Sequence, residues 1–363
     1  MASWYRQEDV HPYETVELIV SGIIPIILIV IGTFGNLISI VILLNQQNRG
    51  TSTNIYLIFL CLMDTISLYQ WNLNHVMYTF TNGTKQIWGQ SVFLCRLGQF
   101  FAFYTLHTSA MFLTFVQLDR ACLLRSRWYK RKIAQPRIAL ILCAIILIVL
   151  FILNGFLFGL GFEYSIYNNS TGMDETLIAC YYSLNQQLND FFRFHYAWIH
   201  LVVMYILPFA VIIVCTLLIM KKLIVKQTFT NNQLAINAQR NRRISLMLLF
   251  MCLAYVVCTL PNRLCFSLFE NQIVGYDYTD TIFLATNTLM YTRNALNAFF
   301  LYISVYGFRR DVRQLILTYW GKLTNKGDLH ENNGNQHVGT MATLREPVRR
   351  TITTTPIKKT SQL

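Results

Sequence analysis

Charged side chains are scarce in this chain. Asp, Glu, Lys and Arg together make up 13% of its 363 residues, whereas hydrophobic residues make up 54%. Soluble domains usually carry about 25% charged residues, so this composition excludes an ordinary water-soluble protein. The uncharged residues gather in long runs, an arrangement typical of a chain whose surface faces lipid.

Three other features are missing from the sequence. The first 15 residues are polar and contain no apolar core, so we expect no cleavable signal peptide and expect the first apolar run to direct insertion. No internal repeat is evident, which argues against a transporter built from inverted halves. No nucleophile and base stand at a catalytic spacing, so we expect no enzyme and no cofactor beyond a bound ion.

Seven apolar runs hold most of the hydrophobic residues. Each is long enough to cross a bilayer as a helix, which takes about 20 residues. The second run is polar in its outer third, which is typical of a helix that lines a cavity. We therefore predict an all-α membrane protein, a bundle of seven transmembrane helices, at residues 16–44, 55–79, 96–124, 137–160, 197–225, 243–269 and 279–305.

The net charge of +13 does not indicate a nucleic-acid partner, because the basic residues follow the predicted topology. All but six of the 30 Lys and Arg residues lie in segments that join the helices at one face, or in the C-terminal segment; the exceptions are Arg6, Lys85, Arg96, Arg193, Arg263 and Arg293. Positive residues gather on the cytoplasmic side of membrane proteins. We expect a plasma-membrane protein with its N-terminus outside and no bound nucleic acid.

Cysteines and glycosylation sequons agree with this sidedness. Cys95 and Cys180 are the two cysteines on the predicted outer side, where oxidation is expected, so a disulfide between them would tie the second outer loop to the third helix. The other cysteines lie within apolar runs or at an inner helix end and are most simply small packing residues. Sequons at Asn82, Asn168 and Asn169 all fall in predicted outer loops.

The seven runs resemble the rhodopsin-like G-protein-coupled receptors over residues 16–323. Several spacings agree together, and the residues that carry them are Gly35-Asn36, Asn54 to Leu57, Leu60, Asp64, Cys95, Ser109, Asp119-Arg120, Pro208, Cys258 to Pro261, Asn297 to Tyr302 and Gly307 to Arg310. The resemblance implies a receptor that activates a heterotrimeric G protein by a shift between conformations.

Several positions depart from the family pattern. Ala121 and Thr216 stand where tyrosines are usual, and Thr259 stands where a tryptophan is usual. Tyr255 replaces a common phenylalanine, and the fourth run contains no tryptophan. These changes indicate a divergent member, and they leave open a receptor that captures its ligand without coupling to a G protein.

The seventh run departs further, because no proline follows Asn297. Counted back from Phe308, the family's tyrosine position holds Leu301. Counted back from Tyr302, its asparagine position holds Ala298. Both registers remain open from the sequence.

Asp119 and Arg120 lie near the end of the third run. By resemblance, Asp119 holds Arg120 at rest, and Arg120 helps to form the G-protein pocket once the helices part. The plain alternative is a pair of interfacial charges that anchors a helix end.

Asp64 is a carboxylate deep in an apolar run, where it needs partners. The resemblance implies that it binds a sodium ion with Ser109 and Asn297, since sodium prefers hard oxygen ligands. Arg293 offers an alternative, because an arginine one turn from Asn297 can pair with Asp64 and displace the ion. We expect a polar core, with sodium or Arg293 as the counter-charge.

Two residues that bind known ligand classes are missing, which excludes amines and retinal as ligands. The position seven residues after Cys95 is Ala102 rather than the aspartate of amine receptors, and the seventh run has no lysine to form a retinal Schiff base. Acidic residues prevail outside, a field that attracts cationic ligands, although such loops can simply balance a basic inner face. We expect a neuropeptide ligand in a pocket lined by Asn74, Gln99, Phe103, His200, Arg263, Phe266, Asn287 and Tyr291. Arg263 can grip the ligand's carboxylate or carbonyl with two N–H groups.

Beyond the bundle we expect three further segments. Residues 1–15 form the outer N-terminus, 306–323 a short amphipathic eighth helix on the inner leaflet, and 324–363 a disordered cytoplasmic tail. The bundle itself takes residues 16–305. Clustered threonines in the tail are candidate phosphorylation sites for arrestin, and Ser361-Gln362-Leu363 resembles a PDZ ligand.

Two other interpretations stay open. A chemosensory receptor for small molecules is compatible with the missing tryptophans and proline. A seven-helix transporter or channel is the more remote alternative, since it predicts interrupted helices and inverted repeats.

Overall fold

The computed structural model describes most of the chain in eight stretches. A compact unit ends at Arg313. The described residues are 13–45, 51–81, 85–168, 173–224, 232–267, 269–273, 275–304 and 308–318. The expected tail, most of the outer N-terminus and the sequons at Asn82 and Asn169 lie outside them.

The first four long helices are close to their expected positions. The elements are α1 (Glu14–Glu17), η1 (Leu18–Ile23) and α2 (Ile24–Asn45) for the first helix, α3 (Ser52–Phe80) for the second, α4 (Val92–Arg125) for the third, and α6 (Pro136–Asn154) with η3 (Gly155–Gly159) for the fourth, while α5 (Arg127–Lys132) lies between the last two.

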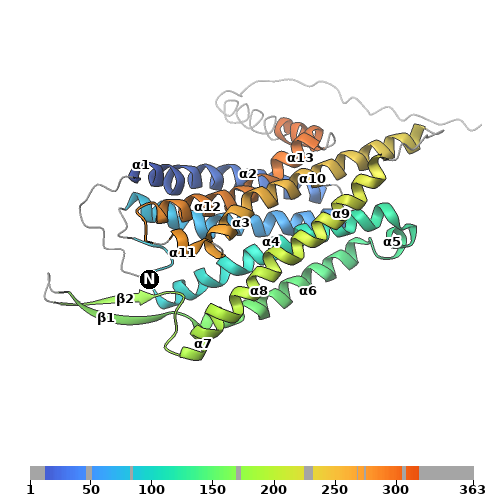
Figure 1. The fold of residues 1–363 in the computed structure, drawn as a ribbon. Helices are drawn as coiled ribbons and strands as arrows, with labels where there is room; N and C mark the ends of the chain where they lie inside the picture. Colours follow the sequence, from blue (N-terminus) through green and yellow to red (C-terminus); the bar gives the residue numbers. More distant parts are fainter. Residues whose placement is uncertain are drawn as a thin grey trace, which may run out of the picture. The chain divides into compact units, whose positions relative to one another are not determined.

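The remaining helices complete a bundle of seven in the described part of the chain (Figure 1). The elements are α7 (Gln186–Asp190), η4 (Phe191–Tyr196), α8 (Ala197–Leu201), η5 (Val202–Ile206) and α9 (Leu207–Ile224) for the fifth helix, α10 (Asn232–Ser267) for the sixth, and α12 (Thr279–Ala295) with α13 (Asn297–Ser304) for the seventh, while α11 (Glu270–Ile273) lies between the last two. The predicted fold class is confirmed.

Local signals explain where several helices begin. Ser91 precedes α4 and its hydroxyl accepts the Leu94 N–H at 3.2 Å, and Ser126 caps α5 in the same way. Pro136 opens α6, where the missing N–H costs nothing. Pro261 lies inside α10, where it removes one helical hydrogen bond.

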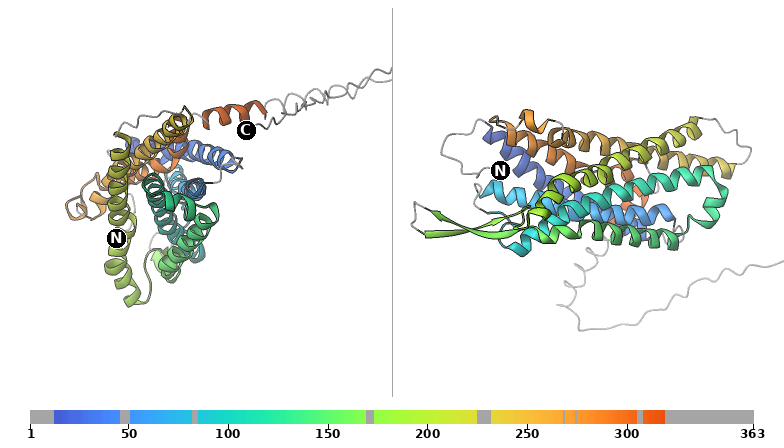
Figure 2. Two further views of the ribbon diagram at one scale, coloured as in Figure 1. Left: turned by 90° about the vertical axis from the view of Figure 1, so that its right-hand side faces the viewer. Right: turned by 60° about the horizontal axis from the view of Figure 1, so that its bottom comes forward.

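Helix α4 lies at the centre of the bundle. Among the other helices of the bundle (Figure 2) it contacts α3, α6, α9 and α10. Many of its residues are buried. Five helical stretches among the described residues are apolar and long enough to cross a membrane, and α4 and the seventh helix are not among them. Many polar residues of α4 and α12 are buried within the bundle, where other helices can supply hydrogen-bond partners.

The loop predicted to be the second outer loop contains a β-hairpin, which was not predicted. Strand β1 (Phe162–Asn168) pairs antiparallel with β2 (Met173–Ala179), and Phe162 faces Ala179 in the register. Both strands extend past the end of the bundle (Figure 1). The fifth helix also begins eleven residues earlier than the expected 197, at Gln186, so the expected loop of 161–196 is shorter.

The inner segments differ from expectation in detail. The sixth helix starts at Asn232, well before the predicted 243, so much of the expected third inner loop is helical. Residues 308–318 form a helix where the amphipathic eighth helix was predicted at 306–323. Phe308 is buried and packs with the main hydrophobic core, as an inward anchor of that helix should.

Candidate functional site

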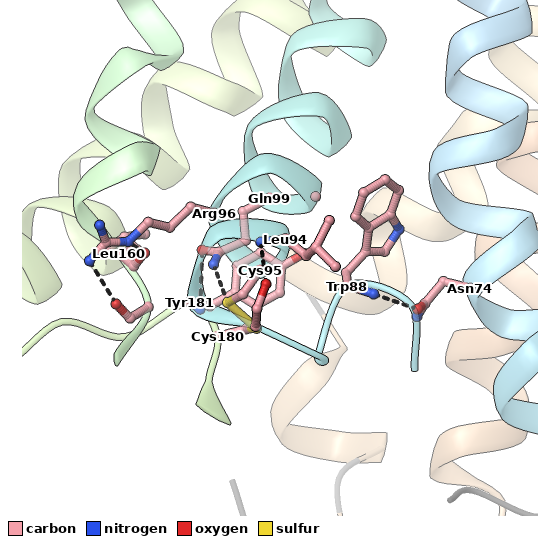
Figure 3. The surroundings of a disulfide bond; sticks show 12 residues. Asn74, Trp88, Leu94, Cys95, Arg96, Gln99, Leu160, Cys180 and Tyr181 are labelled. Carbon is pink, nitrogen blue, oxygen red and sulfur yellow. Dashed lines mark hydrogen bonds between the residues drawn. A yellow bond between two sulfur atoms is a disulfide. The ribbon is translucent and has the colours of Figure 1, made fainter. Parts of the chain in front are cut away.

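The outer end of α4 is tied to the β-hairpin by a disulfide. Cys95 and Cys180 are bonded, with their Cα atoms 5.8 Å apart (Figure 3). The predicted disulfide is confirmed. Cys95 is fully buried, so the bond forms part of the packed base of the loop rather than an exposed strap.

Polar side chains of α4 reinforce this link. Arg96 donates from Nε to the Leu160 carbonyl at 3.2 Å and from Nη2 to the Gly161 carbonyl at 3.0 Å. Gln99 accepts the Tyr181 N–H at 3.1 Å and donates to Cys95 Sγ at 3.0 Å (Figure 3). Arginine fixes two carbonyls at once because its N–H groups form a rigid fork. We call Cys95, Arg96, Gln99 and Cys180 the outer clasp.

Gly161 shows how tightly the outer clasp is packed. Its φ is +100°, a conformation that L side chains rarely adopt, and a Cβ there would lie 3.1 Å from Cys95 Sγ. Gln99, expected to line the ligand pocket, is instead almost completely buried and holds the loop. Its carboxamide is therefore occupied by the outer clasp.

The first outer loop is fixed against α3 and α4. Trp88 donates its indole N–H to the Gln70 carbonyl at 2.6 Å and lies against Gly98, where an added Cβ would come within 2.7 Å of the indole. Asn74, another expected pocket residue, accepts the N–H groups of Ile87 and Trp88 at 2.8 and 3.3 Å (Figure 3). Its carboxamide oxygen therefore orders this loop.

A buried polar network joins the third, fourth and fifth helices. His107 Nε2 lies 2.7 Å from His200 Nδ1, and His107 Nδ1 lies 3.1 Å from Asn154 Oδ1. Tyr196 donates its hydroxyl to the same Asn154 oxygen. Phe103 packs its ring edge-on against His200 and Tyr196. His200 and Phe103, both expected at the pocket, therefore belong to one aromatic and polar cluster.

The sixth and seventh helices bring the other expected ligand residues together. Asn262 donates to Asn287 at 2.7 Å, and Tyr291 stacks on Trp71 with ring centroids 5.8 Å apart. Arg263 lies with its Cζ atom 5.4 Å from the centroid of the Tyr205 ring. The Nε atom of Arg263 is buried without a hydrogen-bond partner among the described residues. The side chain of Phe266 lies outside the described residues.

Asp64 is the centre of a polar cluster in the middle of the bundle. Ser109 donates its hydroxyl to Asp64 Oδ1, and Asn297 donates its amide to Oδ2. Arg293 donates from Nη1 to Ser109 Oγ at 3.3 Å. The structure therefore brings all four expected polar-core residues together. Arg293 reaches Asp64 through the Ser109 hydroxyl rather than directly.

The same contacts decide between the two registers of the seventh helix. Asn297 faces Asp64, so it occupies the asparagine position. Leu301, one turn later, is 3% exposed, whereas Tyr302 is 50% exposed. The inward position that holds a tyrosine in the family pattern therefore holds leucine, and Tyr302 points outward.

Asp119 at the inner end of α4 accepts hydrogen bonds from three hydroxyl groups. Ser52 donates at 2.8 and 2.9 Å to the two carboxylate oxygens, Thr53 donates at 2.5 Å, and Tyr129 donates at 3.0 Å. Burial and the neighbouring Asp119 charge raise the pKa of Tyr129, so its hydroxyl stays protonated as a donor. We call these four residues the inner clasp. The half-buried Arg120 follows Asp119 on the same helix.

The sequence that folds into this arrangement matches the model of a known family. The model of the 7 transmembrane receptor (rhodopsin family) fits residues 35–300. The chain belongs to the rhodopsin family of receptors. It is therefore a membrane protein with several spans, and it belongs to a family that acts through G proteins.

Several known receptors are similar to this chain over part or most of its length. It is 25% identical to neuropeptide Y receptor type 4 of Mus musculus over 299 residues, which cover 80% of this chain and 76% of that protein. It is 27% identical to galanin receptor type 2 of Homo sapiens over 34% of this chain and 31% of that protein. It is 26% identical to a purinoceptor of Mus musculus over 64% of this chain and 58% of that protein.

Several residues of the receptor's polar clusters were not predicted as site residues. Arg96 carried a signal, since it is one of the few basic residues outside the inner face and directly follows Cys95. Asn154 carried another, as the only amide in the fourth apolar run. Ser52, Thr53 and Tyr129 carried none, because hydroxyl residues are common at helix ends.

Proposed function

We propose that this receptor lies in the plasma membrane with its N-terminus outside, binds an extracellular neuropeptide and activates a heterotrimeric G protein. The similarity to neuropeptide Y receptor type 4 over 80% of the chain carries the ligand class. The galanin receptor match supports the same class.

The outer half of the bundle supports a peptide ligand. The outer clasp holds the second outer loop by covalent and hydrogen bonds, and the first outer loop is fixed by Trp88 and Asn74. Ordered loops lose little conformational freedom when a large ligand binds, which favours affinity. Arg263 offers an N–H without a partner among the described residues, which suits a carbonyl or carboxylate of the peptide.

A nucleotide is the second candidate ligand. The similarity to a purinoceptor extends over 64% of the chain, and two arginines, the half-buried Arg263 and the buried Arg293, lie against tyrosine rings. Guanidinium groups bind phosphate with paired hydrogen bonds. A chemosensory small molecule of another class remains a third outcome of the ligand test below.

The ligand class is tested by screening neuropeptides and nucleotides on cells that express the receptor, with G-protein activation as the readout. We expect activation by a peptide. In Arg120→Ala the peptide should still bind while activation falls at least about tenfold, because Arg120 acts on the G-protein side and not at the ligand.

Arg309→Ala is the matched control, because it also removes one positive charge from the proposed inner face, at a position away from Arg120. Its activation by the peptide should equal that of the wild type. Activation only by nucleotides, volatile molecules or lipids would reject the peptide proposal. Peptide binding without any activation in the wild type would indicate a receptor that captures its ligand without signalling.

Sidedness has its own test in the sequons. Asn168 ends β1 at the tip of the hairpin, and Asn82 and Asn169 lie outside the described residues. Replacing all three by Gln should abolish the mobility shift that an N-glycosidase causes in the wild type, since glycans are added only outside. A wild-type receptor without any glycosidase shift, but accessible to an antibody against its C-terminal tail on intact cells, would reverse the proposed orientation.

The proposed partners on the inner side are the G protein, arrestin at the tail threonines and a PDZ domain at Ser361-Gln362-Leu363. The inner face of the described bundle carries basic residues in α5, which favours an acidic protein surface.

A further inference from the structure

The buried Asp64 carboxylate needs a counter-charge, because an isolated ion in the middle of a membrane protein is costly. The family resemblance implies a sodium ion held by Asp64, Ser109 and Asn297. Whether these residues fit such an ion depends on which oxygens are free, how much space is present and what other charge lies nearby.

The oxygen ligands are already used. Ser109 directs its hydroxyl hydrogen to Asp64 Oδ1, and Asn297 directs its amide N–H to Oδ2. Asn297 therefore presents nitrogen rather than oxygen to the carboxylate. A sodium ion would have to replace both hydrogen bonds, and it would gain only the remaining lone pairs of groups that already have partners.

Space beside Asp64 is also limited. A cavity of about 10 Å³ is lined by residues that include Asp64, Arg293 and Asn297. A single water molecule needs roughly this volume. A sodium ion with several ligands, some of them water, needs more room than this.

A positive charge already lines that cavity. Arg293 is only 6% exposed, and its Cζ atom lies 4.7 Å from the centroid of the Tyr255 ring. Its Nη1 donates to Ser109, while Nε and Nη2 are buried without hydrogen-bond partners among the described residues. Two cationic charges in one small cavity would repel each other strongly, since the surroundings screen them weakly.

An aromatic ring of α10, Tyr255, lies against Arg293, and a small residue, Thr259, stands one turn further along the same helix. Thr259 stands where the family pattern has a tryptophan, is fully buried, and turns its hydroxyl to the Tyr255 carbonyl at 2.6 Å. Tyr255 supplies a ring face, which attracts a guanidinium electrostatically. The replacement of a large side chain by a small one in α10 thus accompanies a large cation on α12.

We infer that Arg293 is the resident cation of the polar core, so that the receptor carries its own fixed counter-charge to Asp64 and is insensitive to sodium. The charge of Asp64 is balanced across the Ser109 hydroxyl in every copy of the protein, whatever the ionic conditions. Sodium, whose concentration differs across the membrane, then has no site from which to bias the resting conformation.

The test uses the purified full-length receptor without ligand or G protein, so it does not depend on the proposed function. Its melting temperature is measured in sodium, potassium and choline chloride at matched ionic strength. The wild type should melt at the same temperature in all three salts. In Arg293→Ala the charge and the bulk are gone, so sodium alone should raise the melting temperature, by about 3 °C or more.

Arg293→Lys is the matched control, because it keeps a cation and should stay insensitive to sodium. Asp64→Asn combined with Arg293→Ala should lose the sodium effect, which would assign the new site to Asp64. A saturable, sodium-specific rise of the melting temperature in the wild type would overturn the inference, and this measurement stands even if the Ala variant does not fold. Equal sensitivity of the Lys and Ala variants would overturn it as well.

Discussion

Replacing Cys95 and Cys180 together by serine is expected to remove most of the folded receptor from the cell surface. The disulfide closes a segment with a sequence separation of 85 residues. Loss of such a bond typically costs about 2–5 kcal/mol, against a total stability of about 5–15 kcal/mol. The base of the hairpin would then lose its covalent link to α4 and keep noncovalent contacts such as the hydrogen bonds of Arg96 and Gln99.

Surface labelling and melting of the purified receptor measure this loss. We expect surface receptor to fall at least about fivefold and the melting temperature to fall by about 5 °C or more. Cys265→Ser is the matched control, because Cys265 is a free cysteine in the outer part of α10. A double serine variant that matches the wild type in both measurements would show that the hydrogen bonds of the outer clasp suffice alone.

The helices could be predicted from the sequence because a bilayer imposes a strong requirement. Every backbone polar group in lipid must be satisfied within the segment, so long apolar runs become helices whatever their details. The beginning of the fifth helix was predicted late, since residues 186–196 are polar and aromatic and lie beyond the apolar run. A hydropathy pattern locates the part of a helix that lies in lipid, but it does not show how far the helix continues beyond the membrane.

The hairpin carried a signal that is weaker than those of the helices. Phe162, Tyr164 and Ile166 alternate with polar residues, which is the period of a strand with two different faces. Such a run of seven residues is common by chance in a loop. Its pairing with β2 also depends on the outer clasp, which brings the two ends of the loop together.

Which side chains of the candidate site contact each other could be predicted only where few residues of a suitable kind were available. Two outer cysteines define one disulfide. Asp64, Ser109 and Asn297 were grouped through the family resemblance, and the structure places them in contact. Gln99 and Asn74 stay predicted ligand residues, and the structure adds that both hold loops. These loop contacts were not predicted, because a residue's height in the membrane does not give the direction of its side chain.

The contacts of the inner clasp were also not predictable from the sequence, and they lead to a prediction about ligand-free activation. Asp119→Asn is expected to raise ligand-free G-protein activation at least about fivefold. Each hydrogen bond to a charged group contributes about 1.5–3 kcal/mol, and Asp119 accepts from Ser52, Thr53 and Tyr129. These bonds join α4 to the start of α3 and to α5. We propose that they hold the resting arrangement, so weakening them should destabilise it.

The expected size follows from population shift, because every 1.4 kcal/mol lost from the resting state raises the ratio of active to resting receptor about tenfold. G-protein activation per surface receptor, without ligand, is the measurement. Thr53→Val and Tyr129→Phe each remove one donor and keep the shape, so each should raise activation less than Asp119→Asn does. Gln117→Leu is unsuitable as a control, because it would break the hydrogen bond from Gln117 to the Leu248 carbonyl, which joins α4 to α10.

Thr65→Val serves instead, since among the described residues the Thr65 hydroxyl bonds to the Cys61 carbonyl of its own helix. Its removal should leave ligand-free activation unchanged. If Asp119→Asn behaves like Thr65→Val, the three hydroxyls hold the helix ends together in both conformations and do not restrain the switch. If one of the single donor variants equals Asp119→Asn and the other does not, that one bond carries the restraint and the carboxylate's other partners only orient it.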